Sequence, residues 1–119
     1  MQVLVDSSVW IHYFRTGEKT ERLDTFIENN QICINNLILT ELTPPLRLKR
    51  QFKLIYLLQA IERVELVIDW EEIIDYQTLL ISNGINRVGI PDLIILQNVI
   101  QNDLTLYSFD KHFKLIKKF

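Results

Sequence analysis

The sequence predicts an α/β fold in three layers, α/β/α, with a mostly parallel central sheet of four to five short strands. Short and nearly continuous apolar runs, such as "QVLV", "QICIN" and "LTLYSF", are typical of parallel strands buried on both faces. Segments with a helical spacing of apolar residues separate these runs, which is the order expected of an α/β domain. At 119 residues and 48% hydrophobic content, residues 1–119 are expected to form a single domain with a packed core.

The first half of the chain alternates strands and helices. Apolar residues at positions 9, 10, 13 and 14 have a helical spacing, which Thr16 and Gly17 end. Further on, Asn36 is a candidate N-cap for a helix that Pro44 and Pro45 end or kink. The predicted elements are a strand at 2–5, a helix at 7–14, a helix within 18–30, a strand at 31–35 and a helix from residue 36.

The second half continues this alternation. Asp69 stands three residues before Glu72, the spacing of a capping-box-like helix start, and Gly84 is a good C-terminal stop. The predicted elements are a long helix within 49–64, a strand at 64–68, a helix at 70–84, an apolar helix from 92 to 103, a strand at 104–109 and a last edge strand at 113–118.

The overall charge of the chain does not indicate nucleic-acid binding. The net charge is −2, whereas many nucleic-acid binders are basic overall. Contact with nucleic acid would need a local patch, and "RLKRQFK" offers Arg47, Lys49, Arg50 and Lys53. A solvated helix face explains the same cluster equally well.

The sequence also bears on the compartment. No apolar run approaches the roughly 20 residues of a membrane span, and no secretory signal pattern opens the chain. We therefore expect a cytoplasmic protein with no membrane contact. The single cysteine, Cys33, can form no internal disulfide and is expected in the core.

Four acidic residues stand out by their position: Asp6, Glu41, Asp92 and Asp110. Three of them have an ordinary structural explanation: Asp6 can cap a helix, Asp92 can interact favourably with a helix dipole, and Asp110 can stabilise a turn. Glu41 falls beside an apolar helix face, where a charge is costly unless it is paired or bound to a metal. All four nevertheless follow strands or begin the helices after them. Because ligands of open parallel sheets gather outside the carboxyl ends of the strands, the four acids are expected to converge there.

Four neighbouring carboxylates repel one another unless cations neutralise them, so the cluster predicts a metal. Oxygen ligands favour hard ions, Mg²⁺ or Mn²⁺, and the chemistry expected of such a site is phosphodiester hydrolysis by a metal-activated water. Ser7 and Ser8 would support a ligand carboxylate, a metal-bound water or a phosphate. His12 and His112 are too few and too scattered to indicate a zinc site or a Ser-His-Asp triad.

Four stretches in this order, "VLVDSSVWI", "LTEL", "IPDLIIL" and "LTLYSFDKHF", resemble the PIN domain, and specifically the VapC-type toxins of toxin–antitoxin pairs. The resemblance implies a metal-dependent ribonuclease with a parallel sheet flanked by helices. It maps the acidic metal ligands onto Asp6, Glu41, Asp92 and Asp110, a small hydroxyl residue onto Ser8, and a Ser or Thr two residues before the last acid onto Ser108. It also implies a homodimer and a small antitoxin that inhibits the acidic pocket.

Some features depart from the family pattern: "DLIILQ" is bulkier than usual after the third acid, and "ELTPPLR" differs from the frequent E-L-x-x-G. The leading hypothesis is an endoribonuclease toxin. One alternative is a PIN-like binding module, or a non-toxin PIN nuclease, with little catalysis of its own. A phosphatase with an aspartyl nucleophile would want a second Asp two residues after the first, where Ser8 stands. The apolar helix faces that include Tyr13, Phe26 and Leu58 could form an antitoxin groove, although core packing gives the same pattern.

Overall fold

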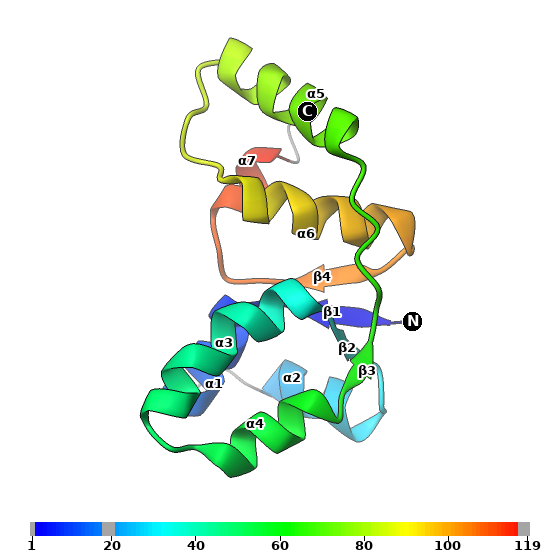
Figure 1. The fold of residues 1–119 in the computed structure, drawn as a ribbon. Helices are drawn as coiled ribbons and strands as arrows, with labels where there is room; N and C mark the ends of the chain where they lie inside the picture. Colours follow the sequence, from blue (N-terminus) through cyan, green and yellow to red (C-terminus); the bar gives the residue numbers. More distant parts are fainter. Residues whose placement is uncertain (1, 18–20, 117–119) are drawn as a thin grey trace.

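The computed structural model describes residues 2–17 and 21–116 and confirms the predicted fold class. A four-stranded sheet crosses the middle of the molecule in the order β3-β2-β1-β4, and every pair of neighbouring strands is parallel (Figure 1). The strands are β1 (Val3–Val5), β2 (Ile32–Ile34), β3 (Glu62–Arg63) and β4 (Thr105–Tyr107).

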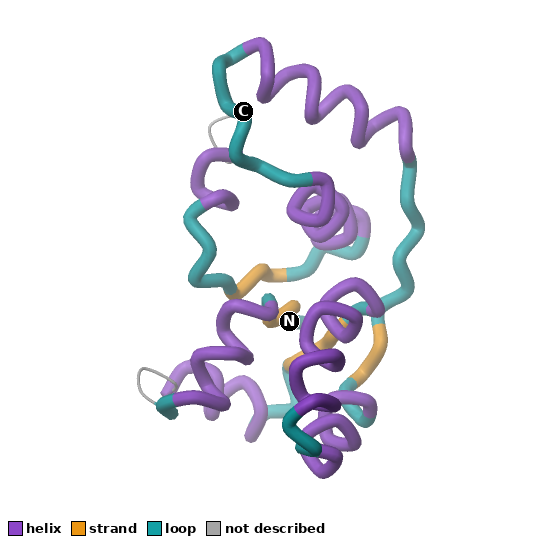
Figure 2. The backbone as a smooth tube through the Cα atoms, turned by 60° about the vertical axis from the view of Figure 1, so that its left-hand side comes forward, coloured by secondary structure: helices purple, strands orange, loops and turns teal. Residues whose placement is uncertain are grey.

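Helices cover the sheet on both sides, and the two groups come from different parts of the chain (Figures 1 and 2). One layer holds α1 (Ser7–Arg15), α2 (Glu21–Glu28), α3 (Asn36–Leu48) and α4 (Phe52–Gln59). The other holds α5 (Trp70–Ser82), α6 (Ile90–Gln101) and the short α7 (His112–Ile116). Among the described residues, none of these helices is long and apolar enough to cross a membrane.

The first strand is the centre of the core. Val3, Leu4 and Val5 are all fully buried because β1 has a strand on either side and a helical layer on each face. Leu4 lies opposite Cys33 of β2 and Leu106 of β4. Cys33 is in the core as expected, and burial raises the pKa of its thiol to about 11, so it carries little thiolate at neutral pH.

Four helices end in the same hydrogen-bonded turn, the Schellman motif, in which one residue takes a left-handed conformation. Behind α3, for example, the N–H of Arg50 donates to the carbonyl of Arg47, and the N–H of Gln51 donates to that of Leu46. The left-handed residues after α2, α3, α5 and α6 are Asn30, Arg50, Gly84 and Asp103, with φ of 53°, 55°, 76° and 51°.

The long helix expected within 49–64 is wrong in its extent, because the turn at Arg50 separates α3 from α4. Conversely, α3 continues to Leu48 through Pro44 and Pro45, both of which are exposed. The N-cap of α3 is Asn35, whose side chain accepts from the N–H of Ile38 at 2.9 Å, and not Asn36.

The strand expected at 64–68 is also wrong, since β3 ends at Arg63. The segment after β3 passes alongside α6. Its backbone carbonyls accept hydrogen bonds from side-chain amides of that helix and not from a neighbouring strand: Asn98 donates to the carbonyl of Glu65, and Gln101 donates to that of Val67. Apolar residues there are exposed or half-buried, in contrast to those of β1.

The edge strand expected at 113–118 is wrong as well, because α7 occupies His112–Ile116; residues 117 and 118 lie outside the described residues. The carboxylate of Asp110 accepts from the N–H of His112 at 2.9 Å, which turns the chain into a helix after β4.

Candidate metal centre

Asp6 lies at the carboxyl end of β1 and is 4% exposed. It occupies the N-cap position of α1, yet its side chain makes no capping hydrogen bond. The carboxylate instead accepts from the hydroxyls of Ser8 and Ser108, each at 2.8 Å and each on the same oxygen, Oδ2. The side chain is therefore turned from the helix end toward the loop that follows β4.

The two serines connect Asp6 to that loop. Ser8 Oγ accepts from the N–H of Phe109 at 3.1 Å, and Ser108 Oγ accepts from the N–H of Asp110 at 3.0 Å. A hydroxyl carries one proton, and each serine donates its proton to Asp6, so the 3.4 Å between the two hydroxyl oxygens marks proximity only. Ser108 thus contacts Asp6 with its proton and the backbone of Asp110 with its oxygen.

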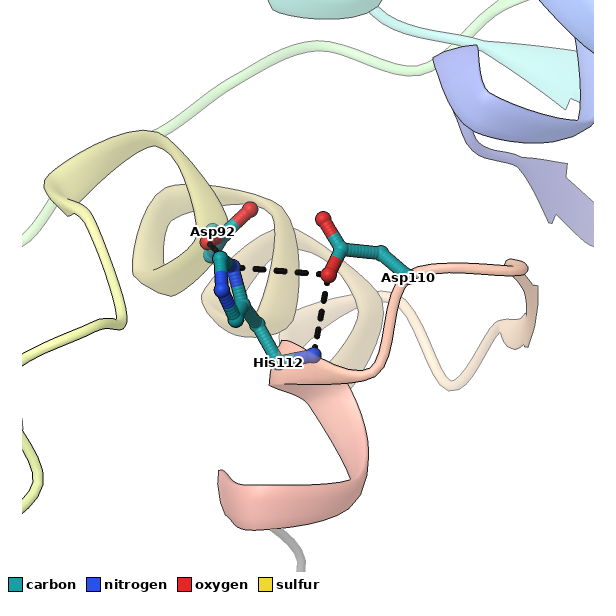
Figure 3. A group of neighbouring side chains, drawn as sticks. All are labelled: Asp92, Asp110 and His112. Carbon is teal, nitrogen blue, oxygen red and sulfur yellow. Dashed lines mark hydrogen bonds and ion pairs between the residues drawn. The ribbon is translucent and has the colours of Figure 1, made fainter.

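A second group of side chains lies close together beside this network. Figure 3 shows Asp92 on α6, Asp110 in the loop after β4 and His112 at the start of α7 pointing toward one another. Each offers one ligand atom, and these atoms all lie within 4.8 Å of one another. Among the described residues, no other set of three or more acids, histidines or cysteines is gathered as closely.

His112 holds the two acids of this group on a single ring nitrogen. Its Nδ1 lies 3.1 Å from Asp92 Oδ2 and 3.4 Å from Asp110 Oδ1. Ionised carboxylates only accept hydrogen bonds, so Nδ1 is the donor of this pair of contacts wherever both acids are ionised. The geometry therefore favours a positioning role for His112.

His112 is not among the metal ligands that the sequence predicts. Its distance from any other histidine argued against a metal site, but the residue acts with carboxylates and not with a second histidine. The signal was its spacing, since it stands two residues after Asp110 in "DKH". His12, the other histidine, packs edge-on against Phe109.

Glu41 comes from α3 and is exposed to solvent. The pKa of its carboxyl is raised, first by desolvation and then by the negative charges of Asp6 and Asp92. A hydrogen bond from Ser7 opposes this rise, and the charge of Asp110 adds to it. The other three acids singled out in the sequence are thus close enough to Glu41 for their charges to raise its pKa.

The pKa of Asp92 is raised as well, mainly by burial of its carboxyl. The hydrogen bond from His112 opposes the rise, the charge of Asp110 adds to it, and the N–H of Gly89 stabilises the carboxylate. A raised pKa on two acids of one cluster means that the folded chain holds negative charge there at a cost.

The donors fit a hard divalent cation. Carboxylate oxygens from Asp6, Glu41, Asp92 and Asp110 supply negative charge, and the pKa values of Glu41 and Asp92 are raised by desolvation and by the charges of neighbouring acids. Carboxylate oxygens make up most of these donors, which suits Mg²⁺ or Mn²⁺.

The candidate RNA-contacting residues are all exposed, and one of them, Lys49, lines a cleft together with Glu41. Arg47 belongs to the last turn of α3, Lys49 and Arg50 to the turn after it, and Lys53 to the first turn of α4.

Known proteins share the fold of this chain. Among solved structures, the fold is similar to VapBC2 from Rickettsia felis bound to a DNA fragment from its promoter, with a TM-score of 0.76 and 21% identity over 96% of this chain and 92% of that chain. It is also similar to VapC20 of Mycobacterium tuberculosis, a toxin that cleaves the sarcin-ricin loop, with a TM-score of 0.64 and 15% identity over 96% of this chain and 94% of that chain.

Comparison with curated protein sequences finds no match. The family model of the PIN domain, however, matches residues 3–118, which span every element of the sheet and all four acids. This confirms the resemblance seen in the sequence: the chain belongs to the PIN domain family.

Proposed function

We propose that this protein is a metal-dependent endoribonuclease and acts as a VapC-type toxin in the cytoplasm. The observation that carries the proposal is the gathering of acids from four separate elements at one edge of the sheet, with raised pKa values on Glu41 and Asp92. Membership of the PIN domain family supports it, as does the likeness of the fold to two VapC-containing structures.

Asp6, Glu41, Asp92 and Asp110 would hold Mg²⁺ or Mn²⁺. When bound, such an ion polarises a phosphoryl oxygen and lowers the pKa of water, which is the chemistry that hydrolysis of a phosphodiester needs.

Other side chains of the protein position these four acids. Ser8 and Ser108 hold the carboxylate of Asp6 through its Oδ2, and its Oδ1 takes no part in these two hydrogen bonds. His112 holds the carboxylates of Asp92 and Asp110 at a constant separation. Ser7 forms a hydrogen bond with the carboxylate of Glu41.

RNA cleavage by the purified protein tests the proposal. We expect cleavage with Mg²⁺ or Mn²⁺, none with EDTA, and a loss of at least about 100-fold in Asp6→Asn and in Asp92→Asn, because each removes a charge that the cation requires. Asp75→Asn, an exposed acid on α5, is the matched control and should cleave normally.

Cleavage that survives both substitutions and EDTA would contradict this mechanism. If metal raises the melting temperature of the wild-type protein but no RNA is cut, the chain is a binding module with the PIN fold and not a nuclease.

We also propose two protein partners. The Rickettsia felis structure contains VapBC2, which supports a cognate antitoxin for this chain. An apolar cavity of about 290 Å³ between α1, α2 and α4 offers such a partner a groove; Tyr13 and Leu58 line it, whereas Phe26 packs against Tyr107. A homodimer is the second expectation, and sedimentation of the purified chain measures it.

A further inference from the structure

A cleft lies between α1 and α3, and one of its ends is the acidic cluster. It has a volume of about 290 Å³. The last two turns of α1 give Ile11 and Phe14 to it, and α3 gives Pro45 and Leu46. Glu41 lines the same cleft, so the apolar walls continue directly from a carboxylate of the proposed metal site.

Two cations also line the cleft, Arg15 from the end of α1 and Lys49 from the turn after α3. Both are exposed, and within the described residues neither forms an ion pair. Lys49 is eight residues from Glu41 along α3, which is about 12 Å at 1.5 Å per residue. The cleft therefore joins an acidic cluster to a pair of cations through an apolar stretch.

The apolar walls, the two cations and the acidic end of the cleft together restrict the kind of ligand that can bind there. Apolar walls accept a flat, weakly hydrated group, and exposed cations at the rim accept phosphates, whereas the acids repel a bare phosphate unless a metal ion is bound. A volume of about 290 Å³ is at the low end of small-molecule sites, which suits one nucleoside better than a longer segment.

We propose that the cleft between α1 and α3 binds the base of one RNA nucleotide next to the scissile phosphate, with Arg15 and Lys49 on the neighbouring phosphates. The inference rests on the proposed function, because it assigns the place of the substrate at the same site. Ile11 and Phe14 contact the base, and Arg15 becomes an RNA-binding residue that the cluster "RLKRQFK" does not contain.

The first experiment measures RNA binding and not cleavage. Asp92→Asn protein, in which cleavage is suppressed, is titrated with a short single-stranded oligoribonucleotide and with a set in which each nucleotide in turn is abasic. We expect one abasic position to weaken binding at least about fivefold, the lower end of what base stacking contributes.

Adding Ile11→Ser should reduce that difference, because the base loses one of its apolar contacts. Ile100→Ser is the matched control: Ile100 is 60% exposed at the end of α6, against 45% for Ile11, so neither change empties the core. The fivefold difference should remain in this control.

The second experiment varies the salt concentration. Each phosphate contact contributes about 0.7 to the slope of log affinity against log salt on single strands, so Arg15→Ala and Lys49→Ala should each lower the slope by about that amount. Arg22→Ala removes an equal charge from the exposed face of α2 and should leave the slope unchanged.

The inference is overturned if the effect of the abasic position is equal in Ile11→Ser and Ile100→Ser, or if no RNA binds at all. It is also overturned if Ile11→Ser weakens a protein partner and leaves RNA binding intact. If the wild-type protein cleaves RNA but the abasic effect does not depend on Ile11, the proposed nuclease stands and the base-binding cleft is rejected. If the abasic effect depends on Ile11 but no RNA is cleaved, the cleft stands and the proposed nuclease is rejected.

Discussion

Glu41 carries a carboxyl whose ionised form the folded protein disfavours. Its pKa is raised by desolvation and by the charges of Asp6 and Asp92, so its contribution to stability is present below the pKa of the unfolded chain, about 4.3. That contribution is lost as the pH rises through the higher pKa of the folded state. Metal-free protein should therefore become less stable as the pH rises from about 4.

Glu41→Gln should remove part of this loss. We expect the variant to be more stable than the wild type in EDTA at pH 7, by roughly a few tenths of a kcal/mol because the side chain is exposed, and equal to it near pH 4. Urea unfolding across this pH range measures it, with Glu65→Gln, an exposed loop acid, as the control. Parallel curves for the wild type and Glu41→Gln would refute the prediction.

Arg50 is held in a left-handed conformation, with φ of 55°, where a side chain normally costs about 1 kcal/mol relative to glycine. Arg50→Gly should therefore stabilise the protein by about 0.5–1 kcal/mol. Asn30→Gly, at the equivalent position after α2, should gain less because asparagine tolerates this conformation.

Chemical denaturation of the two variants measures the difference, and RNA binding by Arg50→Gly should weaken if Arg50 contacts phosphate. An unchanged or lower stability in Arg50→Gly would show that the arginine side chain stabilises the turn in some other way.

Single residues differ in how far the sequence can specify them. Asp6 could be recognised because it ends an apolar strand, but not the direction of its side chain, since Ser108 reaches it from 102 residues away. His112 could not be recognised by counting metal-ligand residues, because its partner Asp92 lies 20 residues away on another helix.

At the scale of elements, α3 and α6 carry Glu41 and Asp92, and a buried pair of amides joins them. Asn35 is fully buried, caps α3 through its Oδ1 and donates its Nδ2 proton to Asn98 Oδ1 at 3.0 Å. Asn98 in turn binds the carbonyl of Glu65. The two helices are therefore positioned by one chain of hydrogen bonds.

Asn35→Ala should destabilise the protein by about 2–4 kcal/mol, because it removes a helix cap and leaves the Asn98 oxygen buried without its donor. Asn36→Ala, one residue later and exposed, should cost less than about 1 kcal/mol. Thermal or urea unfolding compares the two, and equal effects would contradict the assignment of Asn35 as the cap.

Helix boundaries that have a local sequence signal were predicted more accurately than boundaries without one. Asp69 caps α5 through the N–H of Glu72, and Gly84 ends it, because both signals are local. The end of α3 was missed because Arg50 has no sequence signature of a left-handed residue. The segment 64–68 looked like a strand because its apolar residues fit one, whereas its hydrogen bonds come from α6.

At the scale of the whole molecule, the fold class follows from burial. The apolar runs of β1 and β2 require cover on both faces, and the intervening helices supply it. The order of the strands follows less directly, because it depends on which strand pairs with β1 after a long separation in the chain. Convergence of the acids followed from the parallel arrangement alone, since every strand ends at the same edge.

The place of β4 beside β1 has a consequence for synthesis. The N–H of Asp6 donates to the carbonyl of Tyr107 at 2.9 Å, so β1 and β4 must pair before the acids gather. At about 5–20 residues per second, the ribosome takes roughly 5–20 s to reach that partner after making Asp6. An unfinished chain lacks an assembled site throughout this interval, so any cleavage of RNA by the proposed site has to wait until β4 has been made.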